Sequence, residues 1–212
     1  NNESDSDDTE DNDSDLSEKG TSESVEINNI SKKDLKKINK DIDVLTQKVL
    51  NGNLATEYGD EWWVWGLGVA GEQAPSSYKQ NIEKTIKETK GDLGQVTELE
   101  RVIIALSSQG YDATDVAGYN LIEMLESHPE LENPVVNSAI YALIAFNSGD
   151  YEVDAEIENK ILQSVLDAEL ENGGWAFFGN DISPDITGMS LIALANYKDD
   201  EKIKKKIDRA VD

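Results

Sequence analysis

Apolar residues recur at helical spacing from Ser31 onward, and no convincing strand pattern interrupts them. The first segment has a narrow apolar stripe, which predicts a helix with one buried side. Ser31 and Asp34 have the spacing of a capping box and mark the start of this helix. Residues 60–70 are apolar around most of the circumference, which predicts a buried helix. The stripe of the first helix consists of Leu35, Ile38, Ile42, Leu45 and Val49.

The alternation between polar and apolar helices continues to the end of the chain. One-sided helices are expected at 77–90, 154–170 and 199–211, a short helix at 118–127, and apolar helices at 97–106, 135–146 and 185–195. The apolar helices share an alanine–leucine pair at one place: Ala105-Leu106, Ala142-Leu143 and Ala193-Leu194. Hairpins repeated about every 40 residues must stack to cover their apolar members. An open solenoid, a closed ring of concentric helices and an irregular bundle all satisfy this pattern.

Residues 1–30 have a different composition, with eleven acidic side chains against Lys19 alone. Such a segment buries too little apolar surface to offset chain entropy, which predicts a disordered acidic leader or linker before a folded domain at 31–212. Residues 5–9 match the acidic signature of terpene cyclases, but that chemistry needs a buried, positioned acid. Residues 11–15 begin like a calcium loop that then lacks its glycine and its final glutamate. Neither motif is predicted to be a site.

The composition excludes several function classes. The chain has no cysteine, so it forms no disulfide, no thiolate zinc site and no cysteine nucleophile. His128 is the one histidine, and its place before Pro129 in a polar segment indicates a solvated helix end. A net charge of −25 argues against nucleic acid as a partner. No apolar run is long enough to span a membrane. No catalytic residue, metal ligand or cofactor is predicted.

One segment carries a more specific signal than periodicity. Residues 166–175 (LDAELENGGW) and 184–189 (PDITGM) resemble the Gln-Trp repeat of the squalene-cyclase and prenyltransferase superfamily, whose fold is the α/α toroid. Gly173 and Gly174 are expected to end a helix and reverse the chain, with Trp175 packed beneath the loop. Glu169 replaces the glutamine of the repeat, so the usual hydrogen bond to the next helix start is in question.

Three further segments extend the resemblance to residues 55–212. Residues 97–101 (TELER), 118–121 (GYNL) and 137–143 (NSAIYAL) are similar to the bacterial secreted or surface-anchored branch of the superfamily, which is distantly similar to cobalamin carriers and terpenoid cyclases. The resemblance implies an all-α fold, an incomplete α/α toroid that further residues and C-terminal domains complete, and an extracellular or cell-surface location.

The function predicted from this resemblance is a non-enzymatic extracellular binding module for a cobalamin-like or other small ligand, or for a surface partner. The first alternative is a terpene-cyclase-like enzyme, for which Asp185 is the one aspartate left at the equivalent of the acidic motif. A protein prenyltransferase would need a zinc-binding cysteine, which the chain lacks. The second alternative is a structural spacer within a larger surface protein.

Five residues form the predicted ligand site: Trp62, Trp65, Arg101, Asn137 and Asp185. The two tryptophans share one helix face, whereas Trp63 points elsewhere, and at least one of the three is expected in the core. The others lie near the starts of apolar helices.

Packing alternatives exist for the polar members of this set. Arg101 is a cation inside an apolar helix, and an ion pair with Glu98 or another acid is the structural alternative to a ligand contact. Helix capping is the structural alternative for Asp185, as it is for Thr97.

Overall fold

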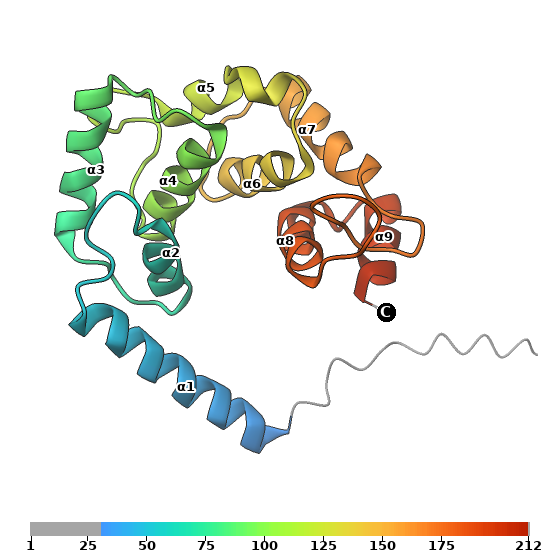
Figure 1. Ribbon diagram of the computed structural model, residues 1–212, viewed down its shortest axis with the longest axis horizontal. Helices are drawn as coiled ribbons and strands as arrows, with labels where there is room; N and C mark the ends of the chain where they lie inside the picture. The colour runs from blue at the N-terminus through green and yellow to red at the C-terminus, as the bar shows by residue number, and fades with distance from the viewer. Residues whose placement is uncertain (1–30, 212) are drawn as a thin grey trace, which may run out of the picture.

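The computed structural model describes residues 31–211, and within this range every regular element is helical, as the sequence predicts (Figure 1). The prediction of a disordered leader at 1–30 lies outside the described residues. None of the helices in 31–211 is both long and apolar enough to cross a membrane. The elements are α1 (Lys32–Asn51), α2 (Glu61–Val69), α3 (Ser76–Thr89), α4 (Val96–Ser108), α5 (Leu121–Glu126), η2 (Pro129–Glu132), α6 (Val136–Phe146), α7 (Ala155–Asp167), α8 (Pro184–Leu194), η3 (Ala195–Tyr197) and α9 (Glu201–Val211).

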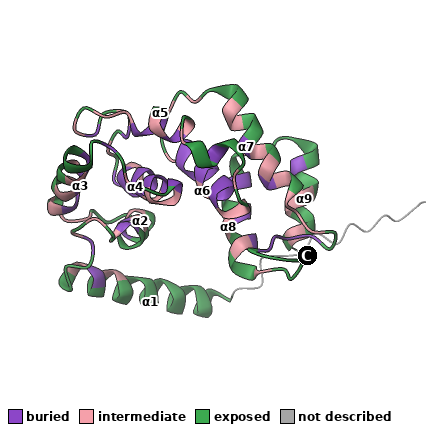
Figure 2. Cartoon of the chain, turned by 45° about the horizontal axis from the view of Figure 1, so that its top comes forward, coloured by how far each residue is buried: buried purple, intermediate pink, exposed green. Residues whose placement is uncertain are grey.

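Two layers of helices follow an arc (Figure 1). The inner layer consists of α2, α4, α6 and α8, each packed against the next, and the outer layer of α3, α5, α7 and α9. Figure 2 shows that burial concentrates on α4 and α6 in the middle of the arc. Residues 31–211 trace an arc and not a closed ring, so the toroid remains a prediction.

The core has the composition that the alternating pattern predicts. All three alanine–leucine pairs of α4, α6 and α8 are buried, because alanine lets neighbouring inner helices approach and leucine fills the space beside it. The outer helices bury single edges. That of α3 consists of Tyr78, Ile82 and Ile86, and that of α7 includes Ile161 and Val165.

The turn between α7 and α8 has the predicted chain reversal and buried tryptophan, but the two glycines do not end α7, which already stops at Asp167. Gly173 and Gly174 have φ values of 79° and 81°, a conformation in which a side chain is strained. Trp175 is completely buried, and its Nε1 donates a hydrogen bond to the Val165 carbonyl at 2.7 Å. Its backbone N–H donates to Thr187 Oγ1 at 2.9 Å, which fixes the start of α8 against the turn.

Two predictions of burial were wrong. The prediction for α2 was wrong because this helix packs mainly against α4 and leaves its other side free: Trp62 is 42% exposed, Trp63 is 50% exposed, and Trp65 is partly exposed. The tryptophan in the core is Trp175. The apolar stripe of α1 is also exposed except at Val49, although Ser31 caps the helix as predicted by accepting the Asp34 N–H at 3.1 Å.

Helix capping, the structural alternative for Thr97 and Asp185, was wrong. The N-cap of α4 is Gln95, and Thr97 lies inside the first turn. Ser183 caps α8 by accepting the Ile186 N–H at 3.4 Å, because Pro184 fits the first helical position. Asp185 is therefore an exposed residue of the first turn. The capping explanation of Asp185 is removed, and its role as a ligand contact stays a prediction.

Candidate functional site

An aromatic cluster lies on the inner layer and contains both predicted tryptophans. The ring centroids of Trp62 and Trp65 are 5.8 Å apart on α2, and Trp62 lies 5.4 Å from Tyr141 of α6. All three residues keep exposed surface, and both contacts are tilted, with interplanar angles of 42° and 54°. The cluster therefore joins two non-consecutive inner helices while leaving aromatic surface accessible.

A hollow of about 210 Å³ lies beside this cluster, at the ends of the four inner helices. It has an apolar part from Trp65, Ile104 and Ile192, and polar groups at its rim. Each inner helix contributes at least one residue, so the hollow depends on the assembled arc. Its lining consists of Trp65, Ile104, Ser108, Ile144, Asn147, Ser148, Ile192 and Asn196.

Arg101 takes part in an ion-pair network between α2 and α4. Its guanidinium donates to the carboxylate of Glu98, and Nη2 lies 3.7 Å from Glu61 Oε2. Tyr58 Oη donates to Glu98 Oε2 at 2.7 Å, which adds a second donor to the same carboxylate. Two acids thus share one cation. The ion pair that was the structural alternative to a ligand contact for Arg101 is therefore present. The Nε of Arg101 is buried without a hydrogen-bond acceptor among the described residues.

The pKa values of this network follow from burial. The side chain of Glu61 is 1% exposed, and burial raises its pKa, while the N–H of Gly59, donating at 2.9 Å, and the Arg101 charge act in the opposite direction. Burial, followed by the hydrogen bond to Glu98, raises the pKa of Tyr58. The Tyr58 phenol is therefore neutral at neutral pH.

Glu100 is a buried acid that the sequence reasoning missed. It is fully buried in α4, and neither carboxyl oxygen has a hydrogen-bond partner among the described residues. Burial raises the pKa of Glu100 to about 9, with a smaller contribution from the charge of Glu130. The side chain is therefore a neutral carboxylic acid at pH 7. The charged pair Glu100-Arg101 inside an apolar helix could have indicated this acid, but the sequence analysis named only Arg101 as a candidate.

Tyr141 is the member of the aromatic cluster that comes from α6. Burial raises the pKa of Tyr141, with smaller contributions from the charges of Glu100 and Asp185. Tyr141 was also missed, although it lies one helical turn after Asn137 and so shares its face. Asn137 is half-buried at the start of α6 and Asp185 is exposed at the start of α8.

The five predicted residues therefore divide into groups. Trp62 and Trp65 meet in the aromatic cluster, Arg101 lies in the ion-pair network, and Asn137 and Asp185 lie at the starts of α6 and α8. Of the five, only Trp65 lines the hollow.

A larger groove lies elsewhere, between α5 and the loops at 110–114 and 149–154, with a volume of about 910 Å³. Its acidic side chains are Asp112, Glu123, Glu126, Asp150, Glu152 and Asp154. The described residues contain no group of three acidic or histidine side chains arranged to hold a metal ion. Asp154 and Asp112 instead accept backbone N–H groups at the start of α7 and in the turn before α5.

Comparisons with protein-family models, with curated protein sequences and with solved structures each find no match to this chain. The class that the structure defines is a two-layered all-α protein with an aromatic cluster on its inner layer. The relation to the cyclase and prenyltransferase superfamily remains a prediction from the resemblance.

Proposed function

We propose that this chain is a non-enzymatic binding module that holds a small ligand against the aromatic cluster Trp62–Trp65–Tyr141. The observation that carries the proposal is the exposed aromatic surface beside a hollow to which all four inner helices contribute. Ligand sites in proteins combine apolar and aromatic walls with a few polar groups, as this hollow does. The extracellular bacterial location and the toroid superfamily belong to the same proposal, and they rest on the resemblance of residues 55–212.

The dimensions narrow the ligand class. A hollow of about 210 Å³ is smaller than the volume that usually encloses a drug-sized ligand. The ligand we infer is therefore flat, stacks on Trp62, and inserts only a small substituent between Trp65 and Ile192. A cobalamin-like molecule has a broad macrocycle that carries small methyl and amide substituents, and it is the first candidate to test.

The cyclase alternative is favoured by one observation, the neutral acid Glu100 buried in the inner helix α4. A protonating acid has to reach its substrate, however, and both carboxyl oxygens of Glu100 are covered. The binding module is the better supported function for this reason.

Equilibrium dialysis against hydroxocobalamin tests the proposal. Saturable binding is expected, and Trp62→Ala is expected to weaken it about tenfold because the stacking surface is lost. Trp63→Ala is the matched control, since Trp63 lies on the same helix, is similarly exposed and pairs with no aromatic ring among the described residues.

The outcomes separate the candidates. Binding that Trp62→Ala weakens and Trp63→Ala does not supports a site on the cluster. Absence of binding to the wild-type chain, or equal loss in both variants, contradicts the cobalamin-like ligand at this position.

A further inference from the structure

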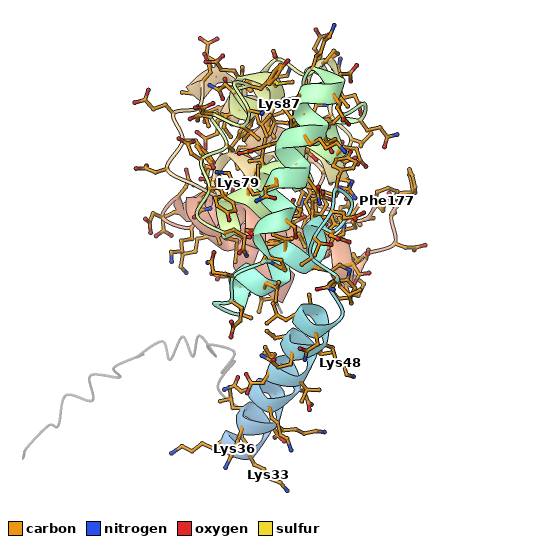
Figure 3. All side chains as sticks on the ribbon, turned by 90° about the vertical axis from the view of Figure 1, so that its left-hand side faces the viewer. Lys33, Lys36, Lys48, Lys79, Lys87 and Phe177 are labelled. Atoms are coloured by element: carbon orange, nitrogen blue, oxygen red, sulfur yellow. The ribbon has the colours of Figure 1, made fainter. Side chains whose placement is uncertain are left out.

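The apolar stripe of α1 is left uncovered by the described residues. Leu35, Ile38 and Ile42 are 43–46% exposed and Leu45 is 60% exposed, whereas Val49 is buried against the rest of the chain. Figure 3 shows α1 extending away from the other helices, with Lys48 at the near end and Lys33 and Lys36 at the far end. Of the helices in 31–211, α1 packs mainly against α2. An exposed stripe of this length is typical of an interaction surface.

The spacing of the stripe defines the kind of partner. The steps from Leu35 to Ile38, Ile42, Leu45 and Val49 are three, four, three and four residues. This is the 3.5-residue repeat of a coiled-coil seam, narrower than the stripe of a helix that packs into a globular core. A seam of this kind is complementary to another helix with the same repeat.

We propose that α1 pairs antiparallel with α1 of a second copy of this chain. In a pair centred on residue 40, Leu35 of each copy faces Leu45 of the other, and Ile38 faces Ile42. This arrangement gives four apolar layers and closes with two-fold symmetry. The proposal concerns the stripe of α1, which contains no residue of the aromatic cluster, and it is argued without the proposed ligand.

Charge complementarity supports the second copy and its direction. Asp34 and Lys48 flank the seam on the same side, so each Asp34 meets Lys48 of the other copy, and symmetry provides this pair twice. Asp41 meets its own counterpart once, and the two uncharged Asn39 side chains meet on the other flank. Attractive pairs therefore outnumber the repulsive one.

The net charge of residues 52–212, which is larger in magnitude than the −10 of residues 1–30, also favours the antiparallel direction. Residues 52–212 carry 30 acidic and 12 basic side chains, a net charge of −18, whereas residues 31–51 carry six lysines and three aspartates. A parallel pair would bring both acidic regions to the same end. The antiparallel pair separates them by the length of α1, about 30 Å, so their repulsion is largely screened at physiological salt.

Sedimentation equilibrium of the full chain tests association. A protein concentration of about 100 µM is used because an interface below the standard size still associates at this concentration. A dimer is expected, and Ile42→Asp is expected to raise its Kd at least about 100-fold. Gln47→Asp adds the same charge on the outward face of α1 and serves as the control. Circular dichroism of both variants verifies that the helices are retained. A monomeric wild-type chain, or an Ile42→Asp dimer of unchanged Kd, overturns the proposal.

Disulfide trapping tests the direction, and the absence of native cysteine makes its result unambiguous. Asn39→Cys is expected to form a covalent dimer on mild oxidation because the two copies of residue 39 meet near the symmetry axis. Leu35→Cys is expected to stay uncrosslinked because its counterparts lie about 15 Å apart along the axis. The opposite result, trapping through residue 35 alone, shows a parallel pair and overturns the antiparallel arrangement.

Discussion

Two buried glutamates in different regions of the molecule have opposite electrostatic states. The Glu169 side chain, between α7 and α8, is 1% exposed, and Glu100, in α4, is fully buried. Burial raises the pKa of each. At Glu169 the hydrogen bonds from Arg209 and Lys206 outweigh burial, and its pKa falls below the ordinary value. At Glu100 no cation of residues 31–211 forms an ion pair, and its pKa rises to about 9.

This difference shows that the side chains of the neighbouring helix determine the free-energy cost of burying a carboxylate. Lys206 Nζ lies 2.5 Å from Glu169 Oε2, and Arg209 Nε lies 2.9 Å from Oε1. Both cations belong to α9, so Glu169 joins the last outer helix to the turn after α7. The charge that acts on Glu100 is the carboxylate of Glu130, which repels its ionised form. One glutamate thus stabilises the packing of α9, and the other is a destabilising group at neutral pH.

The largest expected effect is on the pH dependence of stability through Glu100. Its folded pKa of about 9 lies above the unfolded value of 4.5, so the folded chain retains a proton that the unfolded chain releases. The free energy of unfolding should therefore fall as pH rises from 4.5 toward 9, by about 3 kcal/mol at pH 7. Glu100→Gln should remove this fall.

Urea unfolding followed by circular dichroism between pH 4.5 and 8 measures this fall in the free energy of unfolding. Glu88→Gln, at an exposed position of α3, is the control and should keep the wild-type pH dependence. Parallel curves for the wild-type chain and Glu100→Gln would show that Glu100 ionises normally.

A smaller effect of opposite sign is expected at Glu169. Glu169→Gln removes a charge from two cations that can rehydrate, and it should lower the free energy of unfolding at pH 7 by about 2 kcal/mol. Because the folded pKa is depressed, this contribution is present above the unfolded pKa and is lost as pH falls through the folded pKa.

Thermal unfolding at pH 7 and at low pH checks the Glu169 prediction. Glu171→Gln, two residues further on and exposed, is the matched control and should have little effect. A Glu169→Gln variant as stable as this control at pH 7 would show that the contacts with α9 contribute nothing.

The sequence predicted the local structure and the core because both are encoded by periodicity. The alternating helices and the buried alanine–leucine pairs depend on contacts that repeat along the chain, whereas the burial of Trp175 was predicted from the resemblance to the Gln-Trp repeat. The repeat also predicted the turn at Gly173-Gly174, which needs positive φ values. It did not predict that Glu169 pairs with α9, because that contact spans about 40 residues.

Other features could not be predicted from the hydrophobic pattern of the sequence. An apolar face shows that a surface can be covered but not what covers it, so α1 and Trp62 were expected to be more buried than they are. Trp62 and Trp65 were correctly placed on one helix face, but their partner Tyr141 comes from another hairpin. Glu100 was missed because its burial depends on neighbouring elements. Its sequence neighbour Arg101 has the same local context, so that context does not distinguish the two residues.

The indole N–H resonances of the four tryptophans provide the most direct measurement of the proposed ligand site. Titration with hydroxocobalamin, followed by ¹H–¹⁵N spectra, reports each indole separately in the wild-type chain. Trp62 and Trp65 are expected to shift in a saturable manner, while Trp63 and the buried Trp175, whose Nε1 is bonded to Val165, stay unchanged. Unshifted Trp62 and Trp65 resonances at saturating ligand would contradict binding of a cobalamin-like molecule at the aromatic cluster.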